Sequence, residues 1–80
     1  MPRDPLKEPR IGDVILRNGS HRLVVDRQSQ KVAYAPYDPL AKPLAQLRNP
    51  DTRRKLISLS AYRAWAKDDA KVVLKSEDWI

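Results

Sequence analysis

Short apolar runs separated by polar turns make up most of the chain, and this pattern predicts a mainly β domain. The runs are long enough for strands but too short for stable isolated helices, and several alternate apolar with polar positions. Five runs of this kind occur, at residues 13–17, 21–27, 31–35, 53–59 and 70–74.

Two polar turns join the first three runs into a predicted antiparallel meander. Asn18-Gly19 separates the first two runs, and this pair accepts the positive φ angles of a tight hairpin turn. The second turn occupies residues 28–30. In the run that follows, Val32 and Tyr34 alternate onto the same face of the strand, so Tyr34 is expected to lie with the core.

A short helix is predicted between the fourth and fifth runs. Either Ser58 or Ser60 would cap its first turn, and the helix should stop near Lys67 because two aspartates follow there and oppose the helix dipole. Its apolar positions repeat at helical spacing and are Leu59, Tyr62, Trp65 and Ala66. The two aromatic residues of this face are therefore expected in the core.

Residues 36–54 are predicted to form a long, Pro-rich loop between sheet elements. Asp38 and Pro39 favour the start of one short helical turn, as its cap and its first residue. Pro43 opposes a longer helix, because it lacks the amide that the helix interior needs. On such a turn three leucines would share one stripe, namely Leu40, Leu44 and Leu47.

The order of these elements predicts one small domain with short ends. Residues 1–10 should be an extended or disordered arm, because prolines alternate there with charged residues. A single barrel domain is expected at 11–75, followed by a C-terminal tail at 76–80. A short helix before the last strand is similar to the order found in the Src-homology-3-like barrel, so we expect a five-stranded, partly open barrel.

Several segments at the two ends of the chain carry a further resemblance. They are PRDP at residues 2–5, PRIGDV at 9–14, SLSAYRAWA at 58–66 and AKVV at 70–73. These segments, 23 of the 80 residues, resemble those of small hypothetical proteins encoded in bacteriophage and prophage genomes. The resemblance implies a compact phage-related domain and no assigned activity. Residues 36–54 are longer than the turn expected between these segments, so a specific role could lie there.

The charge of the chain favours polyanions or acidic protein surfaces as partners. Sixteen Lys and Arg against ten Asp and Glu give a formal net charge of +6. Residues 1–55 hold twelve of these basic residues and six of the acidic ones, so the whole excess lies in this part of the chain. A strong positive balance of this kind is typical of binding to phosphates.

The sequence contains neither the residues of a secreted framework nor those of a membrane span. There is no cysteine, the first residues form no apolar export segment, and the longest apolar runs are strand-sized. We therefore expect a cytoplasmic protein with no membrane partner, and the resemblance to phage proteins implies a bacterial host cell.

Catalytic and metal-binding patterns are not present in the sequence. His21 is the only histidine, and no nucleophile motif, metal-ligand spacing or Gly-rich phosphate loop accompanies it. His21 beside Ser20 is more simply a hairpin residue. The prediction is a protein that is not an enzyme and uses no cofactor, no metal and no small-molecule substrate.

Binding of nucleic acid is the function that the basic residues predict. Cations clustered on adjoining strands bind phosphates by releasing counterions, without reading bases. The candidate residues are Arg17, Arg22, Arg27, Lys31, Tyr37, Arg53, Arg54 and Lys55. Tyr34 and Tyr37 could stack on unpaired bases. The same cations would also serve simply as a solvated face that keeps a small domain soluble, and both interpretations stay open.

Protein recognition is the alternative, through apolar residues of the loop and of the C-terminus. The candidate residues are Leu40, Leu44, Leu47, Trp79 and Ile80. The leucines would instead cap one end of the barrel, and Trp79 would pack back on it, if these side chains belong to the core. The alternative function is a module that modulates a host or phage protein, for example an inhibitor of host machinery, or a minor virion assembly protein.

Overall fold

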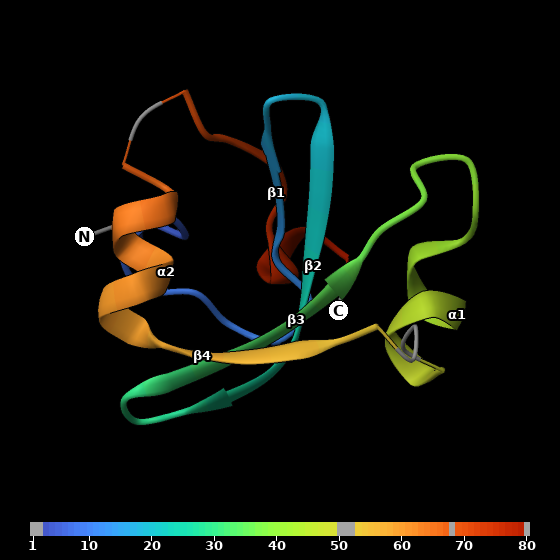
Figure 1. Cartoon of the computed structure of the whole chain (residues 1–80). Coiled ribbons are helices and arrows are strands. Elements are labelled where there is room, and N and C mark those ends of the chain that lie inside the picture. Colours follow the sequence, from blue (N-terminus) through green and yellow to red (C-terminus); the bar gives the residue numbers. More distant parts are fainter. Residues whose placement is uncertain (1–2, 50–52, 68, 80) are drawn as a thin grey trace.

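The computed structural model describes residues 3–49, 53–67 and 69–79, and its centre is one antiparallel sheet (Figure 1). The strands are β1 (Val14–Arg17), β2 (Ser20–Gln28), β3 (Lys31–Pro36), β4 (Lys55–Ser58) and β5 (Lys71–Leu74). The helices are α1 (Pro43–Arg48), α2 (Leu59–Trp65) and the short 3-10 helix η1 (Ser76–Asp78). The mainly β prediction with five strands is confirmed.

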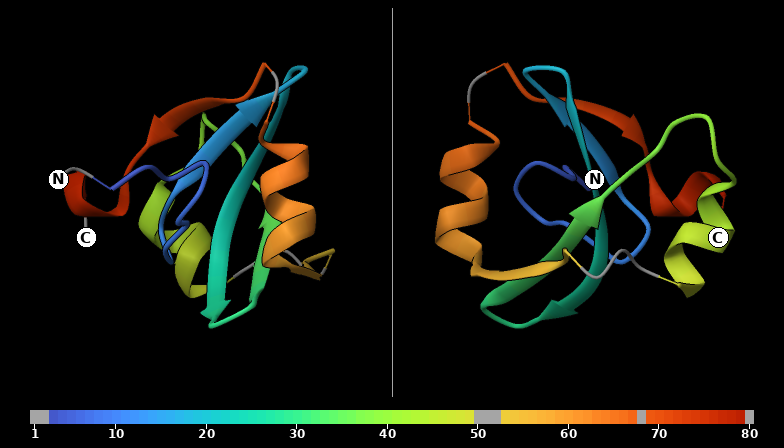
Figure 2. Two further views of the ribbon diagram at one scale, coloured as in Figure 1. Left: turned by 90° about the vertical axis from the view of Figure 1, so that its left-hand side faces the viewer. Right: turned by 45° about the vertical axis from the view of Figure 1, so that its right-hand side comes forward.

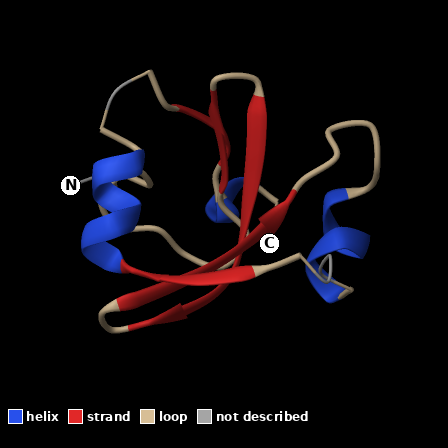
Figure 3. Cartoon of the chain, in the orientation of Figure 1, coloured by secondary structure: helices blue, strands red, loops and turns tan. Residues whose placement is uncertain are grey.

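The strand order is β4-β3-β2-β1-β5, and the sheet is open, with β4 and β5 as its edges. Its ladders shift register between Val14 and Ile15 and again between Val24 and Asp26. Such irregularities increase the local twist of a sheet. As a result, β1 runs steeply across the direction of β4, and the sheet curves around α2 (Figure 3).

The predicted hairpin turn is present between β1 and β2. Asn18 has a φ of 50° and Gly19 a φ of 76°, and the strands pair from Arg17 with Ser20 onwards. Asparagine and glycine tolerate this left-handed backbone better than other residues. The turn therefore sets the register that places Ile15 directly opposite Arg22.

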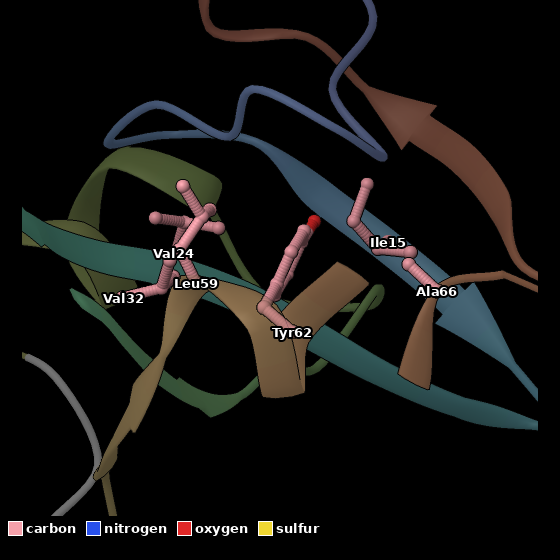
Figure 4. Close-up of a cluster of buried hydrophobic side chains, with 6 residues drawn as sticks. All are labelled: Ile15, Val24, Val32, Leu59, Tyr62 and Ala66. Atoms are coloured by element: carbon pink, nitrogen blue, oxygen red, sulfur yellow. The ribbon is translucent and has the colours of Figure 1, made fainter. Parts of the chain in front are cut away.

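Helix α2 begins where the sequence predicts it and covers the concave face of the sheet. Ser58 is its N-cap, and its side-chain oxygen accepts a hydrogen bond of 3.1 Å from the backbone N–H of Ala61. Side chains from β1, β2, β3 and α2 form the buried apolar cluster shown in Figure 4. Its members are Ile15, Val24, Val32, Leu59, Tyr62 and Ala66. Tyr62 is fully buried, as expected.

The N-terminal segment differs from the extended or disordered arm that its prolines predict. Residues 3–10 contain a turn, and Pro5 is buried. The Tyr62 hydroxyl donates a 3.0 Å hydrogen bond to the Pro5 carbonyl, and Arg63 donates one of 2.8 Å to the Lys7 carbonyl. The segment is ordered because it satisfies the buried polar end of Tyr62, which would otherwise lack a partner.

A buried carboxylate ties this segment to the start of β1 and to η1. Asp13 is 0% exposed and receives two hydrogen bonds from the Arg3 guanidinium, of 2.6 and 2.9 Å. It also accepts from the backbone N–H of Arg10, at 2.8 Å, and from that of Ser76, at 2.9 Å. Arg3 pairs in addition with Glu77, so both ends of the described chain meet here (Figure 2).

The charge network of Arg3, Asp13 and Glu77 lowers the pKa of Glu77, its most exposed member. The hydrogen bond from Arg3, helped by one from Ser76, lowers the pKa of Glu77 from 4.5 to about 2. The hydrogen bond with Asp13 raises the pKa of Arg3, so this guanidinium stays charged. The network is therefore ionic at neutral pH.

Replacing Asp13 with Asn should remove the buried charge and leave Arg3 without its main partner. Breaking a buried ion pair costs about 3 kcal/mol or more, out of the roughly 4 to 12 kcal/mol typical of a chain of this length. We expect a large fall in the free energy of unfolding measured with urea. The exposed Asp26→Asn is the matched control and should change it by less than about 0.5 kcal/mol. Equal stability of D13N and the wild type would contradict the central role of Asp13.

Replacing Glu77 with Gln should change how stability depends on pH. Because the folded-state pKa of Glu77 is lowered, its carboxylate stabilises the fold fully above pH 4.5, and this contribution is lost as the pH falls toward 2. Thermal melts should therefore give the wild type a higher melting temperature than E77Q at neutral pH. The two melting temperatures should converge as the pH falls toward 2. Asp78→Asn, which removes a neighbouring charge, controls for net charge. If the difference in melting temperature between wild type and E77Q stayed constant down to about pH 2, the stabilising role of the ionised Glu77 carboxylate would be refuted.

Candidate nucleic-acid interface

The β1–β2 hairpin brings Arg22 against two aromatic rings. Ile15, its cross-strand partner, lies in the core beneath α2, so Arg22 points to the same face of the sheet. Its guanidinium carbon lies 4.0 Å from the ring centroid of Trp65, on α2, and 4.3 Å from that of Tyr34, on β3. Arg22 is thus held between these rings by cation–π contacts.

The same face continues beyond α2 as a concave basic surface. Tyr34 pairs across the strands with Lys55, at the start of β4, so both side chains share this face. The hollow has a volume of about 340 Å³ and is called the basic groove below. It is lined by Ser20, His21, Arg22, Tyr34, Pro36, Arg53 and Lys55. None of these described lining residues is acidic.

Arg17 adds a further cation next to the groove. It is half-buried near the end of β1, and its guanidinium carbon lies 6.0 Å from the Trp65 ring centroid. Together with Arg22, Arg53 and Lys55, it extends the positive charge around Trp65. Clustered cations of this kind raise the local concentration of anions.

The structure separates Arg27 and Lys31 from the other candidate cations. Arg27 lies at the far end of β2, where it donates hydrogen bonds to the carbonyls of Pro9, at 3.2 Å, and Lys31, at 3.3 Å, and pairs with Glu8. Lys31 stands three residues before Tyr34 on β3, and strand alternation puts the two on opposite faces. Neither residue lines the basic groove.

Tyr37 lies beside the groove, whereas Arg54 stands between two groove residues in the sequence. Tyr37 follows β3 and contacts the His21 ring, with the centroids 6.0 Å apart and the planes tilted by 52°. Partial burial, with the nearby charge of Asp38, raises the pKa of the Tyr37 hydroxyl. Arg54 is exposed and follows Arg53 just before β4.

Helix α1 begins later than the sequence predicts. Its first residue is Pro43 and its N-cap is Lys42, so Asp38 is not the cap. The Asp38 carboxylate instead accepts from the backbone N–H of Leu40, at 2.9 Å, in the preceding turn. Proline suits the first position of a helix, where the amide has no partner to lose.

The leucine stripe of the loop does not cap the sheet. Leu40 is 95% exposed and Leu44 is 47% exposed, whereas Leu47 is half-buried. No residue described in α1 is buried. The loop is held by Gln46, which accepts from the Asp38 N–H and donates back to the Asp38 carbonyl, at 2.7 and 2.9 Å. The apolar stripe therefore remains largely open to solvent.

The C-terminal candidate packs back on the sheet. The Trp79 indole N–H donates a 2.8 Å hydrogen bond to the Gly12 carbonyl, and Trp79 is half-buried. Ile80 lies outside the described residues. Trp79 therefore contributes to the fold around the start of β1, as its alternative interpretation expects.

The described ranges contain no group of three or more His, Asp or Glu side chains placed to hold a metal ion. No helix within them is both long and apolar enough to cross a bilayer.

Trp65 is the functional candidate that sequence reasoning missed, since its helical spacing with Leu59 assigned it to the core. It does pack against the core, but its ring also contacts Arg22. One signal could have found this contact. The Asn18-Gly19 turn predicts the register that pairs Ile15 with Arg22, and an apolar Ile15 implies that Arg22 faces the helix.

Comparisons with known proteins found no match for this chain. No protein-family model matches the chain, no curated protein matches it, and no solved structure matches it.

Proposed function

We propose that the protein is a non-enzymatic accessory protein that binds nucleic acid through the basic groove. The observation that carries this proposal is the convergence of Arg22, Arg53 and Lys55 on one hollow whose described lining has no acidic residue. These cations come from separate segments of the chain, β2 and the start of β4, and only folding brings them together. Arg17 lies close by, on β1.

Phosphate is the anion that this arrangement suits best. A polyanion releases condensed counterions when several cations replace them, which gives affinity without contacts to base edges. A positively charged groove that can follow the phosphodiester backbone is a feature of proteins that bind single strands without sequence preference. Single-stranded nucleic acid is therefore the form proposed.

The fold and the biological setting are part of the same proposal. The strand order β4-β3-β2-β1-β5, with α2 directly before β5, supports an open variant of the Src-homology-3-like barrel. The resemblance to phage and prophage proteins supports a phage-type role in the cytoplasm of a bacterial host. Such a fold hosts many functions, so the proposed binding depends on the groove alone.

A second candidate function is recognition of a protein through the loop that carries α1. The observation that favours it is the leucine stripe, in which Leu40 and Leu44 are both exposed, because a patch of several exposed apolar side chains can mark a protein interaction site. Lys42 and Arg48 flank the stripe, so an acidic partner surface would fit. The partner would be a host or phage protein, or a component of the virion.

Replacing Arg53 and Lys55 together with Ala should weaken binding of a labelled oligothymidylate and flatten its salt dependence. Each phosphate contact to a single strand contributes about 0.7 to the slope of log K against log salt concentration, so two lost contacts should reduce the slope by about 1.4. Fluorescence anisotropy between about 50 and 200 mM salt measures this slope.

The control variant Arg10→Ala with Lys31→Ala loses the same charge outside the groove. It should retain a slope close to that of the wild type. Equal reductions in the two double variants would assign binding to overall charge and remove the groove from the proposal. Absent or salt-independent binding by the wild type would reject the nucleic-acid function itself.

Replacing Leu40 and Leu44 with Ser tests the second candidate. Exposed side chains contribute little to folding, so the free energy of unfolding should change by less than about 0.5 kcal/mol. Capture of a specific protein from nuclease-treated host lysate should be lost in this variant and kept in R53A/K55A. A collapse of the thermal melt would show that the leucines belong to the fold.

A further inference from the structure

Arg22 is confined between two aromatic rings of the fold. It is half-buried, with the rings of Tyr34 and Trp65 at 4.3 and 4.0 Å from its guanidinium carbon. Tyr34 is on β3 and Trp65 on α2, so two separate elements restrain one side chain. An arginine held in this way loses less freedom when it binds an anion.

The hydrogen-bonding capacity of Arg22 is not used inside the described part of the protein. A guanidinium carries five N–H donors in its plane. Among the described residues, no side-chain or backbone oxygen accepts a hydrogen bond from these donors. The Arg22 guanidinium instead contacts the rings of Tyr34 and Trp65. Arg3, by contrast, donates hydrogen bonds to Asp13, to Glu77 and to the Glu8 carbonyl. The donors of Arg22 remain for water or a ligand.

The rings that hold Arg22 are poorly placed for stacking on bases. Arg22 already lies over one face of each of these rings, and Trp65 does not line the groove. The two rings of the remaining aromatic pair, His21 and Tyr37, contact each other at a tilt of 52°, and Tyr37 does not line the groove. Base stacking needs an open ring face, whereas phosphate recognition needs only the edge of the guanidinium.

Resting on the proposed nucleic-acid function, we infer that Arg22 is a phosphate fork, meaning a guanidinium already oriented so that its paired N–H donors can bind a phosphate. We infer also that the groove binds the phosphodiester chain without contacting bases. Tyr34 and Trp65 act as positioning residues that orient the guanidinium plane. Arg53 and Lys55 supply neighbouring charge from the other side of the groove. The ligand class is thus any single strand, irrespective of its sequence.

The test compares two labelled oligomers of about 20 units, longer than a typical single-strand site on a small barrel. One is oligothymidylate and the other is an abasic sugar-phosphate chain of the same length. Fluorescence anisotropy should give dissociation constants within about threefold of each other, since the lost bases contribute little. A loss of more than about tenfold on the abasic chain, with oligothymidylate still bound, would show base stacking and overturn the inference.

Variants of the fork separate its geometry from its charge. Arg22→Lys keeps the charge but loses the planar pair of donors, so binding of both oligomers should weaken by about fivefold or more. Arg10→Lys, outside the groove, is the matched control and should leave affinity unchanged. Wild-type affinity in R22K would overturn the fork.

Tyr34 provides a test of positioning at constant charge. Tyr34→Leu should weaken binding with an unaltered salt slope, because every cation remains, whereas Tyr34→Phe keeps the ring and should restore affinity. Thermal melts of both variants check that the fold survives, and the Phe variant keeps the comparison valid if Leu destabilises the sheet. Equal affinity of the Leu and Phe variants in folded protein would overturn the role of the ring. Failure of the wild type to bind either oligomer would instead reject the proposed function.

Discussion

The ion pair between Arg3 and Asp13 is the constraint on which the rest of the structure depends. A fully buried carboxylate is costly unless several donors satisfy it, and Asp13 receives donors from Arg3, Arg10 and Ser76. These partners come from the N-terminal segment and from η1. The pair and its neighbouring hydrogen bonds therefore fix these two separate pieces of chain around the start of β1. Once the N-terminal segment is in place, it also supplies a partner to the buried Tyr62 hydroxyl.

The core and the candidate site share one helix. Helix α2 covers the concave face of the sheet with Leu59 and Tyr62, joined by Ala66 directly after the helix, and its last residue, Trp65, reaches from the core to Arg22. The position of Trp65 is thus set by apolar burial, and the position of Arg22 follows from it. The groove is built on rigid elements, which favours a fixed geometry for its cations.

Local patterns in the sequence could predict most of the elements, because those signals are local in origin. Asn18-Gly19 sets a turn, and Ser58 caps a helix, without help from distant residues. The ordered N-terminal segment could not be predicted, since the partner of Arg3 depends on how the chain folds and prolines alone suggest an extended arm. The set of cations that line the groove was predicted only in part, because Arg27 lies at the far end of β2 from Arg22 and donates to the Pro9 carbonyl there.

The pairing of β1 with β5 has a consequence for synthesis of the chain on the ribosome. β1 lies between β2 and β5, and Val14 pairs with Leu74. While the intervening residues are being translated, β2 can already cover one edge of β1, but the other edge stays open. An unpaired apolar edge invites association with other nascent chains. We therefore expect the chain to be prone to aggregation until β5 has paired with β1.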